Sequence, residues 1–208
     1  MSPTKVQSGL DFGPTRMRCQ HRKKLHWLNM SDPSPTLRDA IDTDFAEIAE
    51  IYAHYVLNGV ASFEITPPDA NELKIRWQSI RDNGLPYLVI EQAGKIGGYA
   101  YASQFRPRPA YDNTVEDSVY VSPNFPGQGL GQILLTDIIE KCTSLGLRQM
   151  VAIIGDTKNQ PSINLHNKLG FQEIGVMPST GYKLDQWIDT VIMQRTLGDG
   201  DTTPPMLK

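Results

Sequence analysis

The most informative part of the chain reads Val119-Tyr120-Val121-Ser122-Pro123-Asn124-Phe125-Pro126-Gly127-Gln128-Gly129-Leu130-Gly131-Gln132. Its beginning is typical of a β-strand, its Pro/Gly-rich middle predicts a turn, and the apolar residues from Ile133 onward predict a helix. Glycines at alternating positions let the backbone approach a ligand closely, and a following helix would point its unpaired N–H groups and positive dipole end at an anion. The stretch therefore predicts a diphosphate site, with a simple tight turn as the alternative.

The glycine spacing separates this turn from two known phosphate-binding loops. A P-loop requires a lysine directly after its last glycine, whereas Gln132 follows Gly131. A Rossmann fingerprint requires G-x-G-x-x-G, whereas the glycines here stand at positions 127, 129 and 131. A third kind of phosphate cradle is therefore expected.

Strand, turn and helix together resemble the pyrophosphate loop of the GCN5-related N-acetyltransferases, whose signature is Q/R-x-x-G-x-G/A. Gly129 and Gly131 fill the two glycine positions, but Pro126 stands where the family usually has Gln or Arg. The resemblance implies acetyl-CoA as co-substrate, held mainly by backbone groups, and no metal. The residues implied in binding it are Val119, Tyr120, Val121, Gly127, Gln128, Gly129, Leu130, Gly131, Gln132, Asn159 and Ser162.

Hydrophobic periodicity and helix-end signals predict an ordered series of strands and helices between residues 36 and 197. Helices are expected at 45–58, 70–83, 131–145 and 161–169, and strands at 36–38, 87–92, 96–103, 118–121, 149–154, 171–176 and 190–197. This order is that of the acetyltransferase fold. The expected fold class is α/β (α+β), with a mixed, mostly antiparallel central sheet flanked by about four helices.

A second informative stretch is Arg106-Pro107-Arg108-Pro109-Ala110-Tyr111-Asp112, followed closely by Glu116. The alternating arginines and prolines predict a stiff cationic loop, and guanidinium groups match carboxylate or phosphinate oxygens bidentately. A solvated basic turn is the alternative. The run on to Val119-Tyr120-Val121 resembles the phosphinothricin N-acetyltransferase branch, which has cation-x-Arg-x-Ala-Tyr-Asp and then a Glu before Val-Tyr-Val.

That resemblance implies roles for the residues at matching positions. A protonated amine must lose a proton before it attacks a thioester, and Glu116 matches the branch's catalytic glutamate. Without the resemblance, Glu116 is simply a surface residue beside Asp117. The implied substrate-binding residues are Phe63, which lies in a loop that matches the branch, and Arg106, Arg108 and Tyr111.

Asn159, Ser162 and His166 occupy the positions of a further superfamily pattern, namely Asn, a small residue and Tyr. The superfamily's Tyr commonly acts as general acid toward the leaving thiolate, and in this chain, as in the phosphinothricin branch, a histidine replaces it. Imidazole can relay protons near neutrality, so His166 is a candidate catalytic residue. An ordinary core or surface histidine is the alternative.

Composition limits the remaining choices. The chain has 208 residues, a net charge of −3 and a pI of about 5.8, which gives no electrostatic reason to expect a nucleic-acid or membrane partner. Its two cysteines, Cys19 and Cys142, have neither disulfide-framework nor metal-ligand spacing. Residues 1–34 are expected to form a disordered basic arm, with a mitochondrial presequence as the alternative, residues 35–198 the N-acetyltransferase domain, and residues 199–208 a flexible tail.

The resulting interpretation is an acetyl-CoA-dependent N-acetyltransferase for the α-amine of a small amino acid or analogue, of the phosphinothricin or methionine sulfone/sulfoximine type. Direct attack in a ternary complex is expected, because Cys142 on a packing helix is a poor acyl carrier. The partner would be a small-molecule amine, the location cytoplasmic, and homodimerisation is expected as a family feature. The alternatives are a peptide or protein N-acetyltransferase and a non-catalytic acyl-CoA-binding regulatory module.

Overall fold

The structure is a computed structural model, and it describes residues 34–205. The expected basic arm, apart from Ser34, lies outside the described residues, as do the last three residues of the expected C-terminal tail. The boundaries of the expected domain therefore stay predictions.

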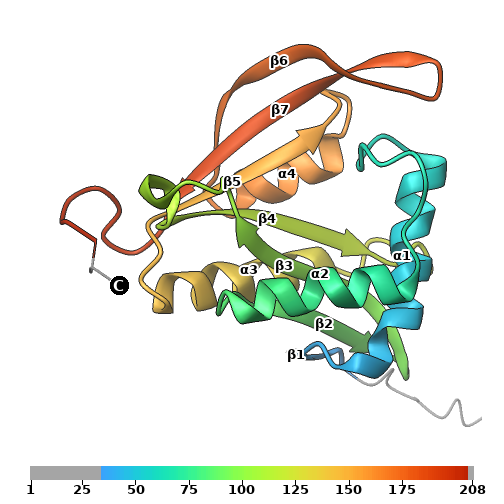
Figure 1. The fold of residues 1–208 in the computed structure, drawn as a ribbon. Helices are drawn as coiled ribbons and strands as arrows, with labels where there is room; N and C mark the ends of the chain where they lie inside the picture. The colour runs from blue at the N-terminus through green and yellow to red at the C-terminus, as the bar shows by residue number, and fades with distance from the viewer. Residues whose placement is uncertain (1–33, 206–208) are drawn as a thin grey trace, which may run out of the picture. The chain divides into compact units, whose positions relative to one another are not determined.

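The fold is one mixed sheet with helices on both faces (Figure 1). The strands are β1 (Thr36–Asp39), β2 (Tyr87–Gln92), β3 (Lys95–Gln104), β4 (Thr114–Val121), β5 (Gln149–Gly155), β6 (Gln172–Lys183) and β7 (Gln186–Thr196). The helices are α1 (Phe45–Asn58), α2 (Ala70–Asp82), α3 (Leu130–Ser144) and α4 (Gln160–Lys168), with short 3-10 turns η1 (Asp42–Asp44) and η2 (Pro109–Tyr111). In the strand order β1-β2-β3-β4-β5-β7-β6 every neighbouring pair is antiparallel except β4 and β5. The expected fold class and element order are confirmed.

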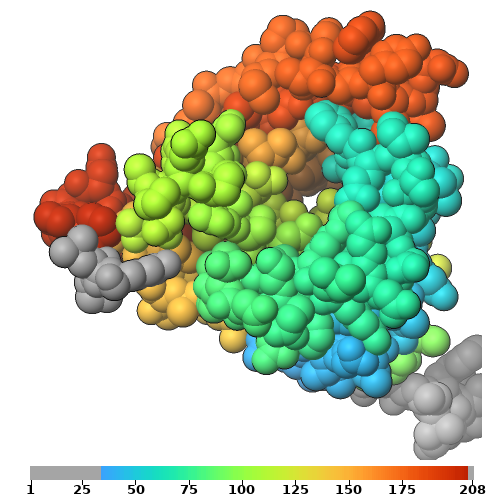
Figure 2. Space-filling view, in the orientation of Figure 1, coloured from blue at the N-terminus to red at the C-terminus, as the bar shows by residue number. Residues whose placement is uncertain are grey.

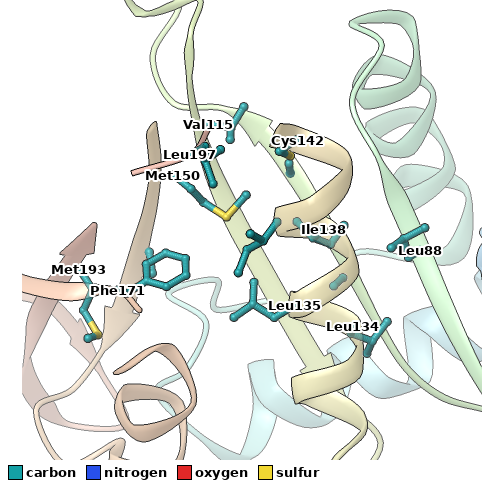
Figure 3. Packing of buried hydrophobic residues seen from close by; sticks show 14 of the residues in the cluster. Leu88, Val115, Leu134, Leu135, Ile138, Cys142, Met150, Phe171, Met193 and Leu197 are labelled. Atoms are coloured by element: carbon teal, nitrogen blue, oxygen red, sulfur yellow. The ribbon is translucent and has the colours of Figure 1, made fainter. Parts of the chain in front are cut away.

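Two apolar clusters hold the helices to the sheet. Helix α3 packs Leu134, Leu135 and Ile138 against small residues of β3 and against Met150 of β5, as the close view of this cluster shows (Figure 3). On the opposite face, α1 and α2 pack Phe45 and Trp77 against aromatic residues of β2 and β3. Alternation along the strands sends successive side chains to opposite faces, so each strand contributes to both clusters.

Local signals in the sequence account for several element ends. Asp69 caps α2, since its Oδ1 accepts the backbone N–H of Glu72 at 2.9 Å, although the Glu72 side chain pairs with Arg76 instead of completing a capping box. Gly146, at φ +79°, follows the end of α3. Leu184 and Asp185 both have positive φ and join β6 to β7 in a two-residue turn, as primed hairpin turns require.

The parallel pair β4–β5 is short, and this positions the site. Pairing extends only over Thr114–Asp117 and Gln149–Ala152. Beyond these residues β4 stays with β3 as far as Val121, while β5 stays with β7 as far as Gly155. The C-terminal ends of β4 and β5 therefore separate, and a wedge-shaped opening forms between them.

Three strands extend at least four residues beyond their expected ends. β4 begins at Thr114 rather than at Ser118, and β6 and β7 extend to Lys183 and Gln186. The pairing of β6 with β7 is irregular between Met177 and Gly181, where Pro178 and Gly181 interrupt the apolar alternation on which strand prediction depends.

The segment after β7 is held by one arginine. Arg148 donates to the carbonyl groups of Gly200 and Pro204 and to the Thr203 hydroxyl, and it lies 3.7 Å from the carboxylate of Asp199. Residues of the segment 199–204 therefore contact Arg148, which directly precedes β5. The flexible tail expected from the sequence stays a prediction.

Candidate active site

A cavity of about 390 Å³ lies between the separated ends of β4 and β5 and the start of α4. The space-filling view shows an opening bordered by the loop after α1, β4 and the β6–β7 hairpin (Figure 2). A larger, open hollow of about 700 Å³ lies between α2 and α3, but it contains none of the predicted site residues. The cavity at the separated strands is lined by Tyr55, Ala61, Asp117, Ser118, Val119, Tyr120, Val121, Ala152, Ile153, Ile154, Gly155, Asn159, Pro161, Ser162, Leu165 and His166.

The backbone at the start of α3 forms the cradle expected from the glycine spacing. Gly127 and Gly129 adopt φ values of +71° and +76°, which only glycine adopts without strain, and Gly129 is the N-cap residue of α3. After Phe125, whose N–H donates to the Ser122 carbonyl, the next backbone N–H with an acceptor in the described structure is that of Gln132, which donates to the Gly129 carbonyl at 3.0 Å. The preceding N–H groups, at residues 127–131, are free to bind an anion at the positive end of a helix.

Gly131 lets α3 approach the strand that lines the cavity. A Cβ atom at this position would lie 3.3 Å from Val121 Cγ2 and 3.4 Å from Leu165 Cδ2. A larger residue would push the start of α3 away from β4. The predicted residues Leu130 and Gln132 are the neighbouring residues of the same helical turn, and Leu130 is buried in the core.

The open edge of β4 carries unpaired backbone groups. Beyond Asp117 the groups that would face β5 have no strand partner, and such amides suit a ligand that contains amides of its own. The carbonyl of Val121 accepts the Tyr55 hydroxyl at 2.7 Å, so this group is already bonded. The side chain of Tyr120 faces the other way and stacks on Tyr99, at 5.2 Å between ring centroids. Tyr120 can therefore contribute its backbone to the cavity, while its ring belongs to the core.

Asn159 and Ser162 lie at the start of α4, on the opposite side of the cavity from β4. Asn159 is the N-cap residue of α4, and its Oδ1 accepts the Ser162 N–H at 3.4 Å. Both residues line the cavity. The cap uses Oδ1 of Asn159, which leaves the amide nitrogen as a donor for a ligand.

His166 is buried and forms hydrogen bonds with both ring nitrogens. Nδ1 donates to the Ser162 carbonyl at 2.7 Å, and Nε2 donates to Asp117 Oδ2 at 3.0 Å. The Ser162 carbonyl can only accept, so Nδ1 carries a hydrogen, and an ionised Asp117 carboxylate can likewise only accept, which assigns a hydrogen to Nε2 as well. With both hydrogens the ring is an imidazolium paired with the Asp117 carboxylate. Burial alone would lower the pKa of His166, but the hydrogen bond and charge of Asp117 more than offset it, so the pKa is raised.

Glu116 is the next-to-last residue of β4 that pairs with β5, and strand alternation sends its side chain to the face opposite that of Asp117. Its side chain is half-buried. Burial and the adjacent charge of Asp117 raise the pKa of Glu116 above its ordinary value, while the charge of Arg106 opposes the shift. A carboxylate whose pKa is raised toward neutrality is a stronger base, as a general base should be.

The predicted substrate-binding residues are only partly brought together. Arg106 lies near enough to Glu116 to act on its charge, but Arg106, Arg108 and Tyr111 are all exposed, and Tyr111 packs edge-on against Phe105. Phe63 lies at the ends of β5 and β6, where Cβ atoms at Gly155 and Gly181 would lie 3.1 and 3.3 Å from its ring. The backbone N–H of Arg108 donates to the Arg106 carbonyl at 2.9 Å, and its carbonyl accepts the Tyr111 N–H at 2.8 Å. Within residues 34–205 the Arg108 side chain forms no hydrogen bond or ion pair.

Sequence reasoning missed Asp117, which proves to be the partner of His166. The available signal was strand alternation: a residue next to Glu116 on one strand must face the opposite side, toward α4. It also missed Lys183, a buried lysine that contacts the loop carrying Phe63. That contact joins residues 121 positions apart, and no short-range pattern encodes it.

Among residues 34–205 there is no group of three or more His, Cys, Asp or Glu side chains placed to hold a metal ion. In the same range no helix is long and apolar enough to cross a membrane. Asp117 and His166 line the cavity together with backbone groups of β4, while Glu116 precedes Asp117 on β4 and is not part of the lining.

The fold combines a mixed sheet, two parallel strands that separate, and a helix start whose backbone N–H groups are free. This arrangement suits an extended anionic ligand. A family model, described as the acetyltransferase (GNAT) family, matches residues 45–171. The chain belongs to this family.

Individual relatives agree with the family assignment. The chain is 50% identical over 170 residues to a phosphinothricin N-acetyltransferase of Alcaligenes faecalis, which covers 82% of this chain and 86% of the relative. It is 38% identical over 172 residues to an L-methionine sulfoximine/L-methionine sulfone acetyltransferase of Pseudomonas paraeruginosa, covering 82% and 99%. Among solved structures, a phosphinothricin acetyltransferase of Sinorhizobium meliloti in complex with AcCoA superposes with a TM-score of 0.80 at 49% identity, covering 83% and 93%.

Proposed function

We propose that this chain is an acetyl-CoA-dependent N-acetyltransferase that acts on the α-amine of a small amino acid or analogue, of the phosphinothricin or methionine sulfone/sulfoximine type. The observation that carries the proposal is the separation of β4 from β5 directly after Asp117, with Glu116 at the branch point and the free N–H cradle beyond it. The names of the relatives at 50% and 38% identity support the same reaction.

The described residues fit acetyl-CoA as the acyl donor, which supplies the activated acetyl thioester. The N–H groups of residues 127–131 would hold the diphosphate, and their number compensates for the missing side-chain donor at Pro126. The unpaired edge of β4 from Ser118 to Val121 would hold the pantetheine amides, with Asn159 and Ser162 across the cavity.

Glu116 would take the proton from the substrate ammonium, directly or through a water molecule. The free amine then attacks the thioester carbonyl in a ternary complex, and a backbone N–H near Tyr120 would stabilise the charge on its oxygen. Because the pKa of Glu116 is raised, the deprotonated form that the reaction needs is lost as the pH falls through that pKa. Activity should therefore fall on the acid side.

His166 would act on the leaving thiolate. Both of its ring hydrogens are held by protein acceptors, so donating one would break the bond to Ser162 or the bond to Asp117. We therefore assign to His166 a positive charge in the cavity wall, which favours the thiolate, rather than free proton transfer.

Arg106 and Arg108 would attract the acid group of the substrate. Arg106 is the better placed, since its charge reaches Glu116. Both arginines are exposed, and the Arg106 guanidinium lies over the Phe105 ring, 5.2 Å from its centroid. A cationic loop favours a small anionic acceptor over a Lys-rich peptide.

We also propose that the protein forms homodimers, as expected from the family. β6 is an edge strand, and the β6–β7 hairpin exposes large apolar side chains that a second copy would cover. These are Ile174, Val176, Met177, Tyr182, Leu184 and Trp187. Light scattering after size exclusion tests this: a mass of twice the chain supports it, and a single-chain mass at micromolar concentration contradicts it.

The experiment that tests the function is thiol release from acetyl-CoA with a panel of amines: phosphinothricin, methionine sulfone, methionine sulfoximine and a Lys-rich peptide. Turnover of the small amino-acid analogues supports the proposal. Turnover of the peptide alone favours a protein acetyltransferase. Acetyl-CoA binding without turnover of any amine favours a regulatory binding module. We also propose a cytoplasmic location. Imaging the full chain in cells beside a chain that starts at Met30 tests it: the same diffuse distribution of both supports a cytoplasmic location, and mitochondrial import of the full chain alone contradicts it.

A further inference from the structure

A buried lysine connects the β6–β7 hairpin to the loop that follows α1. Lys183, the last residue of β6, is only 5% exposed. Its Nζ donates to the Ser62 carbonyl at 2.6 Å. Figure 1 shows this loop next to the turn end of the hairpin. Nothing in the proposed mechanism uses this lysine, although burying an ammonium group is costly unless it is bonded.

The loop is also held from the side of the helices. The Tyr52 hydroxyl of α1 lies 2.9 Å from Ser62 Oγ and donates to Glu64 Oε1 at 2.8 Å. Arg76 of α2 donates to the same carboxylate oxygen at 2.6 Å. The residues on both sides of Phe63 are therefore fixed by three different elements, α1, α2 and β6.

Phe63 itself has no polar anchor, and its ring position depends on its neighbours. The ring packs against the backbone at Gly155 and Gly181, where a side chain would collide with it, and 41% of its surface stays exposed. Ala61, two residues earlier, lines the cavity between β4 and β5. Gly155, against which the ring packs, lines the same cavity, so Phe63 lies next to the space proposed for the acceptor.

From this arrangement we infer that Lys183 is a positioning residue for the acceptor: it holds the Ser62 carbonyl so that Phe63 forms one wall of the amine-binding space. The inference rests on the proposed function for its substrate. It adds that affinity for the amine depends on a tether between β6 and the loop after α1. Burial lowers the pKa of Lys183, while the charge of Glu64 opposes the shift, consistent with an ammonium group shielded from water.

Replacing the lysine tests the tether. Lys183→Met keeps the length of the side chain and removes the donor, whereas Lys183→Arg keeps a donor. Lys95→Met, at an exposed position at the start of β3, is the matched control. We expect Lys183→Met to raise KM for the amine about tenfold, as the loss of a charged hydrogen bond implies. kcat and KM for acetyl-CoA should stay near wild type, and Lys183→Arg should recover part of the change.

Hydrogen exchange supplies a readout that needs no substrate. Amides of residues 59–69 should exchange faster in Lys183→Met than in the wild type, and no faster in Lys95→Met. If the wild type is active, two results for Lys183→Met would overturn the inference. One is an unchanged KM for the amine, and the other is a fall in kcat and in acetyl-CoA affinity together with lower thermal stability. If the wild type acetylates no amine, the proposed function fails, and unchanged exchange in residues 59–69 would then overturn the tether independently.

Discussion

The buried pair of Asp117 and His166 makes a sharp prediction about stability and pH. The carboxylate and the imidazolium meet at 3.0 Å, with their side chains only 2% and 5% exposed. Removing one partner of a buried ion pair costs about 3–5 kcal/mol, since the other charge is left uncompensated. We therefore expect Asp117→Ala to lower the free energy of unfolding by about this amount at pH 6. Asp117→Asn can donate to a neutral imidazole and should cost less, about 1–3 kcal/mol.

The pH dependence follows from the raised pKa of His166. Burial opposes the raised value, and the hydrogen bond and charge of Asp117 outweigh it. The stability contributed by the protonated ring is fully present below the unfolded pKa of about 6.5 and is lost as the pH rises through the folded pKa. Over that window the native state holds one more proton, so wild-type stability should fall by at most about 1.4 kcal/mol per pH unit from this group.

Urea unfolding followed by fluorescence between pH 6 and pH 8.5 measures both effects. Asp117→Asn should remove the fall with rising pH, so the wild-type and variant curves should converge toward the alkaline end. Asp42→Asn, which breaks an exposed pair with Lys74, is the matched control and should cost at most about 1 kcal/mol. Parallel curves for the wild type and Asp117→Asn across this range would refute the charged-pair assignment.

Three further predictions concern the cradle, the cavity and the core. In Gly129→Ala the new Cβ would meet no atom within 4 Å, but the residue would have to adopt φ +76°, which strains any residue except glycine. We therefore expect a KM for acetyl-CoA that is severalfold higher and an unchanged KM for the amine. Equal changes in both KM values would contradict a role in the cradle. Gly155→Ala would place a Cβ against the Val60 carbonyl and the Phe63 ring, so it should lower the melting temperature and weaken amine binding, and a fully active variant would show that the loop yields. Burial and the charge of Asp117 raise the pKa of Cys142 to about 12; in a Cys19→Ser background the thiol should react with a disulfide reagent only after unfolding, and rapid reaction of the folded protein would contradict its burial.

Local patterns in the sequence predict most of the fold. Helices α1 to α4 begin and end within a few residues of the positions given by apolar spacing, by the Asp69 cap and by Gly146. The positive φ values at Gly127 and Gly129 were also predictable, because alternating glycines permit them. The outer half of the β6–β7 hairpin was not predictable, because Pro178 and Gly181 interrupt the strand pattern in the sequence. In the structure this half is still a strand, because it pairs with β7.

The candidate site was predictable where a short motif encodes it. Glu116 and the residues around it follow from the motif that precedes Val119. The pairing of Asp117 with His166 joins β4 to α4 across 49 positions, and Lys183 reaches Ser62 across 121 positions. Such contacts depend on how the elements pack, so a motif can identify His166 but cannot show that both of its nitrogens are occupied.

Thiol release from acetyl-CoA with phosphinothricin and methionine sulfone, compared between the wild type and Glu116→Gln, tests the proposed base. Glu140→Gln, at an exposed position on α3, is the matched control. We expect turnover in the wild type and in the control, and a fall in kcat of about 10²–10⁴ in Glu116→Gln with acetyl-CoA binding unchanged. Wild-type turnover in Glu116→Gln would contradict the assignment of Glu116 as the base at the branch of β4 and β5.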